Sequence, residues 1–573
     1  MKERQIVIGR NSNPEEKKFI GVAWPYVNGE LHVGHLAGYI LPADIFARYL
    51  RATGNDVLMV SGSDCFGTPI TVEADEKGVS PEEIVRIYHE KDVHLFKNIL
   101  GLTYDIYTKT ETEHHVKVVQ DFFIGLLEKD YIFIDTTKQY YSPQEKRFLP
   151  DRYVEGTCKN CGYNDARSDQ CDHCGKVLEQ GDLENPRSKL SGKEVGLRDT
   201  QHYFLDWPKL QPQIEEYVKE KGPNWKNWVY QETLGWLRKG IKPRAISRDI
   251  DWGVPLPADR IPKSMHIENM EHKRLYVWFD AVIGYLSASL LWSEQTGGSW
   301  EDFWKNPGSR HYYFMGKDNL IFHTIFWPGQ LMAYDPELHL PDVPNINMFL
   351  NLEGKQFSKS RGVSIPIEDI VAKFGNDPVR FYLTLIMPEL KDSSFSWREF
   401  VQRNNEILVG NLGNFLHRVL SLAQGVNIEE VASNYELSEK TSEEIEKAFG
   451  GARKHLGSCE FRNYLKDVFK LSSYGNKLIN TETVWALKKE DPKKFKEALK
   501  QLYCVILSLG ILTLPIFPES SEKIFGMLGL EKVALWPESG QELAKIESLL
   551  LKIDSSVKPK PLFKKIDLSV PSL

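Results

Sequence analysis

The sequence has no apolar run long enough to cross a membrane. Its longest apolar stretch, Leu502 to Phe517, holds 16 residues and contains Pro515, whereas a spanning helix needs about 18 to 20. The stretch therefore predicts a buried helix. The first residues also lack the apolar core that a signal peptide needs, so we expect a cytoplasmic protein whose thiols are reduced.

The chain also lacks an excess of positive charge. Lysine and arginine number 72 against 79 acidic residues, which gives a net charge of −7, so any nucleic-acid partner must be met by local basic patches. With 573 residues, of which 41% are hydrophobic, the chain predicts about three or four globular units. It contains no repeats or low-complexity tracts.

Cysteine is scarce, with seven residues, and four of the seven form two CxxC pairs separated by nine residues. Two such pairs in a reducing compartment are typical of a closed, tetrahedral zinc site with a structural role, and they disfavour disulfides or a redox dithiol. The predicted zinc ligands are Cys158, Cys161, Cys171 and Cys174.

The first part of the chain alternates strand-like and helix-like segments. Lys17 to Ala23 and Asp56 to Ser61 are short apolar runs, and helical patterns follow them at about His32 to Arg51 and Pro81 to Asn98. This alternation favours an α/β fold with a parallel sheet wrapped by helices, as in a nucleotide-binding domain of Rossmann type.

The alternation breaks between about Tyr131 and Ile241, which predicts an insertion that carries the cysteines. Strand-like runs then resume at Leu275 to Phe279, His311 to Met315 and Asn345 to Leu350, and helical spacing dominates from Ser396 onward. The expected units are the first half of the catalytic domain, the zinc insertion, the second half, a loop and stem-contact region, an all-α bundle and a tail, at residues 1–130, 131–240, 241–350, 351–395, 396–549 and 550–573.

His32, Gly34 and His35 form an HxGH motif where a strand and loop lead into a helix. Both imidazoles can point from one helical face, and the free N–H groups of a helix N-terminus suit phosphates. The glycine between them allows close approach of a ligand. Alone the motif is weak, because two histidines at this spacing are as often surface or core residues as ligands.

A second motif lies between Gly354 and Gly362, in a loop that contains KQFSKSR. Its ammonium and hydroxyl groups can neutralise charge on a triphosphate when the loop closes. A solvated basic loop is the alternative. The two motifs together, each beside half of a split sheet, favour the functional interpretation.

At these residues the chain resembles the class I aminoacyl-tRNA synthetases, whose signatures are written HIGH and KMSKS. More narrowly it resembles the methionyl-tRNA synthetase family. The strings that carry the resemblance are AWPYVNGELHVGH, SGSDCFGTP, ISRD, YVWFDAVIGY, MGKDNLIFHTIFWP and KQFSKSRG. The resemblance implies activation of methionine by ATP, with Mg²⁺, to methionyl-adenylate, followed by transfer to the 3′-terminal adenosine of tRNA(Met).

The resemblance also implies site residues. His32, Gly34, His35, Lys359 and Arg248 would form the catalytic set, although an Arg-Asp neighbour pair could equally be structural. ATP would be bound by the two histidines together with Asp318, Lys355, Ser358 and Lys359. Gln356 stands where the signature loop often has its first lysine.

For methionine, the resemblance implies that Asp64 takes the amino group and that aromatic residues surround the side chain, since rings make favourable contacts with sulfur. Without the resemblance most of these aromatics would be assigned to the core. Trp24, Val282 and Asn319 depart from the Leu, Pro and Ile expected at wall positions. The predicted pocket consists of Trp24, Tyr26, Asp64, Trp278, Ala281, Tyr285, Phe322, His323 and Trp327.

The helical bundle is expected to bind the anticodon through Asn411, Phe415 and Trp485, with a core tryptophan as the alternative for Trp485. Ser188 and Ser191 resemble a CxxC pair in which serine replaces both cysteines, so one zinc is expected. The tail near Phe563 is expected to fold back over the catalytic part, and a monomer is expected. The rival functions are another class I synthetase for a hydrophobic amino acid and a non-catalytic tRNA-binding paralogue.

Overall fold

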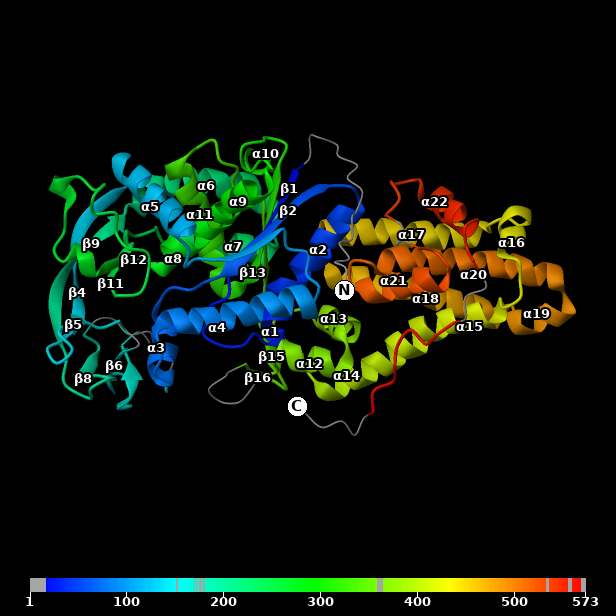
Figure 1. Cartoon of the computed structure of the whole chain (residues 1–573), viewed down its shortest axis with the longest axis horizontal. Coiled ribbons are helices and arrows are strands. Elements are labelled where there is room, and N and C mark those ends of the chain that lie inside the picture. Colours follow the sequence, from blue (N-terminus) through cyan, green and yellow to red (C-terminus); the bar gives the residue numbers. More distant parts are fainter. Residues whose placement is uncertain are drawn as a thin grey trace.

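The computed structural model describes residues 17–150, 153–168, 171, 173–174, 178, 181–357, 364–531, 535–554 and 559–567. The molecule is elongated, with the insertion at one end, a parallel sheet in the middle and a helical bundle at the other end (Figure 1). Among the described residues, no helix combines the length and the apolar character needed to cross a membrane.

The central sheet has five parallel strands in the order β14-β13-β1-β2-β3. Strand β1 lies in the middle and pairs with β2 on one side and with β13, from beyond the insertion, on the other. The two half-sheets are thus joined at β1, which is the arrangement expected of a Rossmann-like sheet split by an insertion. The strands are β1 (Lys17–Val22), β2 (Asp56–Ser63), β3 (Ile106–Lys109), β13 (Arg310–Gly316) and β14 (Val343–Asn347).

Side chains alternate between the two faces of this sheet, and each face has its own core. Ile20, Val22, Met59, Tyr312 and Phe314 belong to a core that continues into the helical bundle. We call this the bundle-side face. The opposite, insertion-side face consists of Phe19, Leu58, Val60, Tyr313 and Met315, whose core continues into the insertion.

Helices cover both faces and connect the strands. The helical stretch that follows the HxGH motif packs on the bundle-side face, and α9 packs on the insertion-side face. These elements are α1 (Val33–His35), η1 (Leu36–Ile40), α2 (Leu41–Ala52), α3 (Thr68–Lys77), α4 (Pro81–His94), η2 (Leu95–Ile99), α5 (Glu113–Glu128), α8 (Val277–Asp280), η7 (Ala281–Ile283), α9 (Gly284–Thr296), α10 (Glu301–Trp304), η8 (Lys317–Asn319), η9 (Phe322–Phe326) and α11 (Trp327–Tyr334).

The insertion is built around the long antiparallel pair of β4 and β9, with a small three-stranded sheet that carries the cysteines. Its elements, including the short strands that lead back to the catalytic domain, are β4 (Ile132–Ser142), β5 (Arg147–Phe148), β6 (Val154–Cys158), β7 (Ala166–Arg167), β8 (Leu183–Ser188), β9 (Gly196–Leu205), α6 (Trp207–Lys221), η4 (Gly222–Asn224), α7 (Asn227–Arg238), β10 (Arg244–Ala245), β11 (Ser247–Asp249), η5 (Lys263–Met265), η6 (Met270–His272) and β12 (Lys273–Leu275).

After the sheet, a small three-stranded sheet and two helices lead into the bundle. Helix α20 is the most buried element of the bundle, since every residue from Ala498 to Thr513 is buried. The elements are β15 (Leu350–Leu352), β16 (Lys355–Gln356), α12 (Ile367–Phe374), α13 (Asn376–Leu385), β17 (Ser393–Phe395), α14 (Trp397–Arg403), η11 (Asn404–Gly413), α15 (Asn414–Leu422), α16 (Ile428–Asn434), α17 (Glu439–Gly457), α18 (Phe461–Thr481), α19 (Val484–Glu490), α20 (Pro492–Thr513), α21 (Pro518–Met527) and α22 (Glu542–Leu550).

The expected fold class is confirmed, and the apolar stretch from residue 502 is a buried helix up to Thr513. One strand prediction was wrong. Leu275 to Phe279 does not enter the parallel sheet, because β12 ends at Leu275 in a two-stranded antiparallel sheet and helix α8 follows at once. The apolar run is buried in a helix, which periodicity in so short a segment cannot distinguish from a strand.

Candidate active site and metal site

The HxGH motif lies beyond the carboxyl end of β1, where ligands bind in open parallel sheets. His32 is the N-cap of the helical stretch: its Nδ1 accepts from the Gly34 N–H at 3.1 Å, and the His32 N–H donates to His35 Nδ1 at 3.2 Å. Because each Nδ1 is an acceptor, each neutral ring carries its proton on Nε2. Both rings can therefore donate from Nε2 to phosphate oxygens.

The loop of the second motif meets the first motif through Phe357. Its ring stacks on His32 with a centroid distance of 4.5 Å and an interplanar angle of 11°. Gly34 is required here, since a Cβ at this position would lie 2.8 Å from the His32 ring and 3.1 Å from Phe357. Lys355 is exposed in β16, while Ser358 and Lys359 lie outside the described residues. Phe357 was missed as a site residue, although it belongs to the KQFSKSRG string.

Asp318 follows the carboxyl end of β13, the strand beside β1. A side chain on Gly316 would meet the Asp318 carboxylate at 2.8 Å, so glycine lets this carboxylate fold back over the strand end. The neighbouring Lys317 binds Asp392 at 3.0 Å, and Asp392 also accepts from the Phe349 N–H at 2.9 Å. These contacts tie the Asp318 loop to the small sheet that carries Lys355.

Asp64 lies at the end of β2 and is 5% exposed. Its backbone forms a bridge with the Tyr26 loop: the Asp64 N–H donates to the Pro25 carbonyl at 2.8 Å, and the Val27 N–H donates to the Asp64 carbonyl at 3.2 Å. Burial raises the pKa of the Asp64 carboxyl well above its usual range. An ammonium group bound here would reverse that shift, because it would supply the missing counter-charge.

Asp280 is a second buried carboxyl that sequence reasoning missed. It is fully buried, and neither of its oxygens has a hydrogen-bond partner. Burial, with the nearby Asp64 charge, raises its pKa well above the usual range. Asp280 lies between Trp278 and Ala281 in the string YVWFDAVIGY. Pocket roles were predicted for its neighbours in this string but not for Asp280. Buried acids without partners cluster at functional sites.

Most of the predicted pocket residues lie together. Trp278 stacks on Phe322 at a centroid distance of 4.1 Å, and Tyr26 meets Trp278 edge-on at 6.4 Å. Tyr285 and Trp327 are buried on the insertion-side core, and Ala281 begins the turn η7 before α9. Sequence spacing could not have shown these contacts, because the residues come from three separate segments.

His323 is fixed from both sides of its ring. Its Nδ1 donates to the Asn319 carbonyl at 3.0 Å, so Nε2 accepts from the Tyr285 hydroxyl at 2.8 Å. Burial lowers the pKa of His323 to about 4, and the ring is therefore neutral at pH 7. The contact of Asn319 with His323 uses its backbone, while its side chain hydrogen-bonds the Asp318 carboxyl.

The ring of Trp24 packs closely against two glycines, Gly62 and Gly284. Added Cβ atoms on Gly62 and Gly284 would lie 2.4 and 2.8 Å from its ring. Val282 is buried behind the wall. Arg248 is half-buried: its guanidinium donates to the Ala245 carbonyl at 2.8 Å and lies 4.1 Å from the centre of the Tyr276 ring.

The four predicted zinc ligands converge. Their Sγ atoms all lie within 4.8 Å of one another, with Cys158 and Cys174 at 4.0 Å and Cys161 and Cys171 at 3.6 Å. Four sulfurs at 2.3 Å from a tetrahedral zinc would be about 3.8 Å apart. The donor set and its spacing therefore fit one metal ion, with no position left for water.

The serine pair forms the same kind of turn as the cysteine pair. In Ser188–Gly192, the Gly192 N–H donates to the Ser188 carbonyl at 2.8 Å, as the Gly162 N–H does to Cys158. The Ser188 hydroxyl binds Glu145 at 2.8 Å in place of a metal.

In the bundle, the predicted anticodon residues do not share one environment. Asn411 is half-buried in η11 and hydrogen-bonds Ser472, Ser473 and Asn476. Trp485 is 50% exposed, so it is not a core tryptophan. Phe415 is fully buried against Gly475, so its ring cannot stack on a base in this structure.

Arg418 was missed in the sequence. It lies one turn beyond Phe415 in α15, and its guanidinium is 5.9 Å from the centre of the exposed Trp485 ring. Arginine beside an exposed tryptophan is a common platform for an unstacked base. Arg418 follows Asn411 by seven residues, a spacing that places both residues on the same face of a helix, and this spacing could have indicated Arg418 in the sequence.

Comparison with known proteins shows the family to which the chain belongs. The family model "tRNA synthetases class I (M)" matches residues 18–420, and "Anticodon binding domain of methionyl tRNA ligase" matches residues 429–569. The fold is similar to the solved Mycobacterium tuberculosis methionyl-tRNA synthetase in complex with methionyl-adenylate, with a TM-score of 0.75 over 96% of this chain and 99% of that one, at 22% identity.

Closer relatives in sequence are methionine–tRNA ligases. The enzyme of Thermomicrobium roseum is 44% identical over 89% of this chain and 86% of its own length. That of Thermobifida fusca is 40% identical over 96% of each chain. Since both family models and these relatives cover nearly the whole sequence, the chain belongs to the methionyl-tRNA synthetase family of class I aminoacyl-tRNA synthetases.

Proposed function

We propose that this chain activates methionine with ATP to methionyl-adenylate and transfers the methionyl group to the 3′-terminal adenosine of tRNA(Met), at the site formed by the carboxyl ends of β1, β2 and β13. The observation that carries the assignment is the convergence of the HxGH histidines with Phe357 of the second motif, beside the buried Asp64. Family membership gives the reaction, and this convergence supports the residues.

In the first step, Asp64 holds the ammonium of methionine and Asp280 adds a second acidic group nearby. The aromatic wall around Trp278 and His323 receives the thioether, since rings attract sulfur. The methionine carboxylate then attacks the α-phosphate and pyrophosphate leaves. The chain forms no covalent bond to the substrate, so catalysis rests on positioning and on charge stabilisation.

The phosphates are stabilised by the Nε2–H groups of His32 and His35 and by the free N–H groups of the helix that they begin. Asp318 binds the ribose of ATP. Lys355, Ser358 and Lys359 approach the departing pyrophosphate from the loop. Arg248 lies on the Tyr276 ring and supplies positive charge to the tRNA end or to the substrate.

In the second step, the bundle binds the tRNA. Asn411, Trp485 and Arg418 contact the anticodon, and the buried Phe415 supports them from inside. Exposed cations between Arg238 and Arg244 bind acceptor phosphates, so binding weakens with salt despite the acidic total.

Zinc is the metal that we assign to Cys158, Cys161, Cys171 and Cys174, where it would hold the insertion's turns together. Mg²⁺ is expected to enter with ATP and to neutralise phosphate charge. We also propose that the protein acts in the cytoplasm, where thiols remain reduced, and that it acts as a monomer.

The test is methionine-dependent exchange of pyrophosphate into ATP, with leucine, isoleucine, valine and cysteine as the matched panel. Exchange is expected with methionine alone, and charging of tRNA(Met) is expected to follow. Preferential exchange with leucine or valine would assign the chain to another specificity. No exchange with any amino acid, alongside binding of tRNA, would favour the non-catalytic paralogue.

A further inference from the structure

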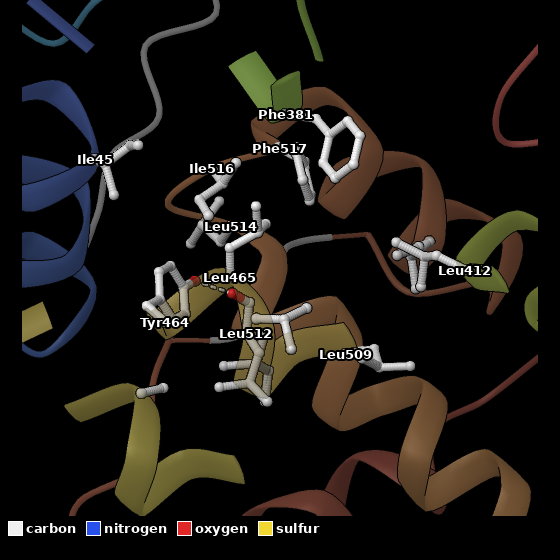
Figure 2. Close-up of a cluster of buried hydrophobic side chains, with 14 of the residues drawn as sticks. Ile45, Phe381, Leu412, Tyr464, Leu465, Leu509, Leu512, Leu514, Ile516 and Phe517 are labelled. Atoms are coloured by element: carbon white, nitrogen blue, oxygen red, sulfur yellow. Dashed lines mark hydrogen bonds between the residues drawn. The ribbon is translucent and has the colours of Figure 1, made fainter. Parts of the chain in front are cut away.

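Helix α13 lies where the catalytic domain meets the bundle. Figure 2 shows the apolar part of this junction: Ile45 of α2 faces Ile516 at the end of α20, and Phe381 of α13 lies beside Phe517. These side chains belong to the core that runs from the bundle-side face into the bundle. Because interiors are close-packed, the two parts cannot shift freely past each other.

Arg380 of α13 is fully buried within this apolar junction. Its Nε donates to the Ile516 carbonyl at 2.6 Å, and its Nη2 donates to the Pro515 carbonyl at 3.0 Å. Both carbonyls lie just past the end of α20, where the helix dipole favours a cation. Arg380 therefore binds the backbone that directly follows the central helix of the bundle.

The same arginine reaches the catalytic domain. Its Nη2 lies 2.7 Å from Asp44, which is also fully buried. Asp44 accepts from Arg48 at 2.8 Å and, through its other oxygen, from the Thr103 N–H and hydroxyl at 3.1 and 3.0 Å. Burial alone would raise the pKa of Asp44, but the two arginines hold it at about 2.

Asp44 belongs to the helical stretch that His32 begins. Elements α1, η1 and α2 follow one another without a gap from Val33 to Ala52. At 1.5 Å per residue, Asp44 lies about 18 Å along this stretch from His32. A contact at Asp44 thus connects the bundle to a point on this helix that is distant from the two histidines.

Helix α13 holds the bundle at a second point. The carboxylate of Asp377 accepts from the Ser520 N–H at 2.6 Å and from its hydroxyl at 2.5 Å, in the first turn of α21. One turn later along α13, Arg380 donates to the carbonyls of Pro515 and Ile516, which lie just past the end of α20. Helix α13 therefore binds the turn between α20 and α21 at two points and connects this turn to the HxGH helix through Asp44. It also contacts η11, the element that carries Asn411.

We propose that Arg380 is a positioning residue that fixes the bundle relative to the HxGH helix through Asp44, so that a tRNA held at its anticodon presents its 3′ end correctly to the active site. This inference rests on the proposed function. It predicts that loss of the Arg380–Asp44 contact affects the two reactions differently. Methionine activation, which needs no tRNA, should continue, whereas the preference of the charging reaction for a tRNA with the correct anticodon should decrease.

The experiment compares Arg380→Met, Asp44→Asn and the double variant with the wild-type protein. Pyrophosphate exchange with methionine is expected to stay within about twofold, because both residues lie far from the substrates. The ratio of kcat/KM between tRNA(Met) and the same tRNA with one altered anticodon base is expected to fall by at least about fivefold, the lower end of typical coupling between sites. The double variant should resemble the single ones in this ratio, because the Asp44–Arg380 contact is lost in all three, while the Arg48 contact with Asp44 changes only where Asp44 is replaced.

Arg380→Lys serves as a second variant if Arg380→Met does not fold. It keeps the charge beside Asp44 but cannot reach both carbonyls, so an intermediate loss of anticodon discrimination is expected. Lys447→Met, which removes an exposed ion pair on α17, is the matched control and should change neither reaction.

Parallel losses of exchange and charging, or unchanged anticodon discrimination in a folded Arg380 variant, would overturn the proposal. Failure of the proposed function looks different, because the wild-type protein itself would then show no methionine-dependent exchange.

Discussion

Two buried acids on the bundle side of the sheet, Asp44 and Asp377, bind buried polar partners, whereas two buried acids on the insertion side, Asp64 and Asp280, have no counter-charge. Asp44 and Arg380 pair at 2.7 Å, and Asp377 binds Ser520. Beyond the other face, both oxygens of Asp280 are unpaired and the pKa of Asp64 is raised by burial. The two faces belong to the same strands, so the difference lies in what each core is for.

Paired buried charges hold two parts of a molecule in one arrangement. Unpaired buried carboxyls reduce stability, and they persist where a ligand supplies the partner. The bundle-side core thus connects the catalytic domain to the bundle, while the buried acids of the insertion side are the ones that we propose bind the ammonium group of methionine. The comparison can be tested by changing one side at a time.

The largest effect is expected from Asp64→Asn on the insertion-side. Loss of the charge that pairs with the ammonium should lower kcat/KM for methionine about 100-fold or more, since breaking a buried charge pair costs about 2 to 5 kcal/mol. Unfolding free energy at pH 7 should not fall, because the buried Asp64 carboxyl has no counter-charge, and an asparagine oxygen can also accept the hydrogen bond from the Phe66 N–H. Pyrophosphate exchange and urea unfolding measure the two quantities.

Glu443→Gln, an exposed change on α17, is the control for Asp64→Asn and should leave both quantities unaltered. A variant that loses stability while retaining its KM for methionine would mean that Asp64 is structural, and the contrast between the two faces would disappear.

A smaller loss is expected from Gly34→Ala in the HxGH motif. Its methyl group would lie 2.8 Å from the His32 ring, so the ring must turn and its Nε2–H must leave its position. We expect exchange to fall about tenfold to 100-fold, in the range of a lost transition-state hydrogen bond. Gly38→Ala is the matched control, since its Cβ would meet nothing within 4 Å. Equal losses in the two variants would contradict a special role for Gly34.

The order of strands and helices around the sheet was predictable because apolar runs of strand length alternate with helical patterns. The cluster of four cysteines was predictable because two closely spaced CxxC pairs are typical of one metal site. The pocket wall was known only by resemblance, since contacts such as Trp278 with Phe322 join segments more than 40 residues apart.

Other features follow from packing that no local pattern encodes. In the sequence, nothing distinguishes Asp280 from an exposed acidic residue. Only the fold shows that both of its carboxylate oxygens are buried without a hydrogen-bond partner. Phe415 and Trp485 looked alike as aromatics of the bundle, yet one is fully buried and the other is 50% exposed. In the tail, the Ile566 N–H donates to the Asn405 side chain and the Lys564 carbonyl accepts from the Asn404 side chain, so two segments far apart in the sequence meet at η11.

Removing the metal is expected to have a more modest effect on activity. Cys158→Ser should lower the metal content from one zinc per chain to none, as measured by elemental analysis. The cysteines belong to a small core of their own. It reaches the active site through the Tyr153 hydroxyl, which binds Asp75 at 2.7 Å on α3, the helix that follows the Asp64 loop.

Exchange should therefore fall less than about tenfold in Cys158→Ser, an effect on the order of 1 kcal/mol. Tyr153→Phe is the matched variant: it should keep the zinc and share part of the loss in activity. Full zinc content in Cys158→Ser would contradict the ligand assignment.

The smallest effect at neutral pH is expected from His323 on the insertion side, because its protonation changes stability only in acid. Burial lowers its pKa to about 4, below the value of about 6.5 for the unfolded chain. The unfolded state therefore binds the proton first as the pH falls. The stability that the neutral ring contributes is fully present above pH 6.5 and is lost progressively between pH 6.5 and about 4.

The pKa values of Asp64 and Asp280 are raised, so protonation of these carboxyls stabilises the folded state as the pH falls. The contribution of His323 is therefore measured as the difference between the wild-type protein and a variant that lacks its imidazole. Wild-type unfolding free energy should fall more steeply with decreasing pH than that of His323→Gln, by up to about 1.4 kcal/mol per pH unit. His272→Gln, at a site where the side chain is 70% exposed, is the control and should follow the wild-type curve. Identical slopes for wild type and His323→Gln would mean that the ring is hydrated in the folded protein, and the insertion-side core would then be no drier than the surface.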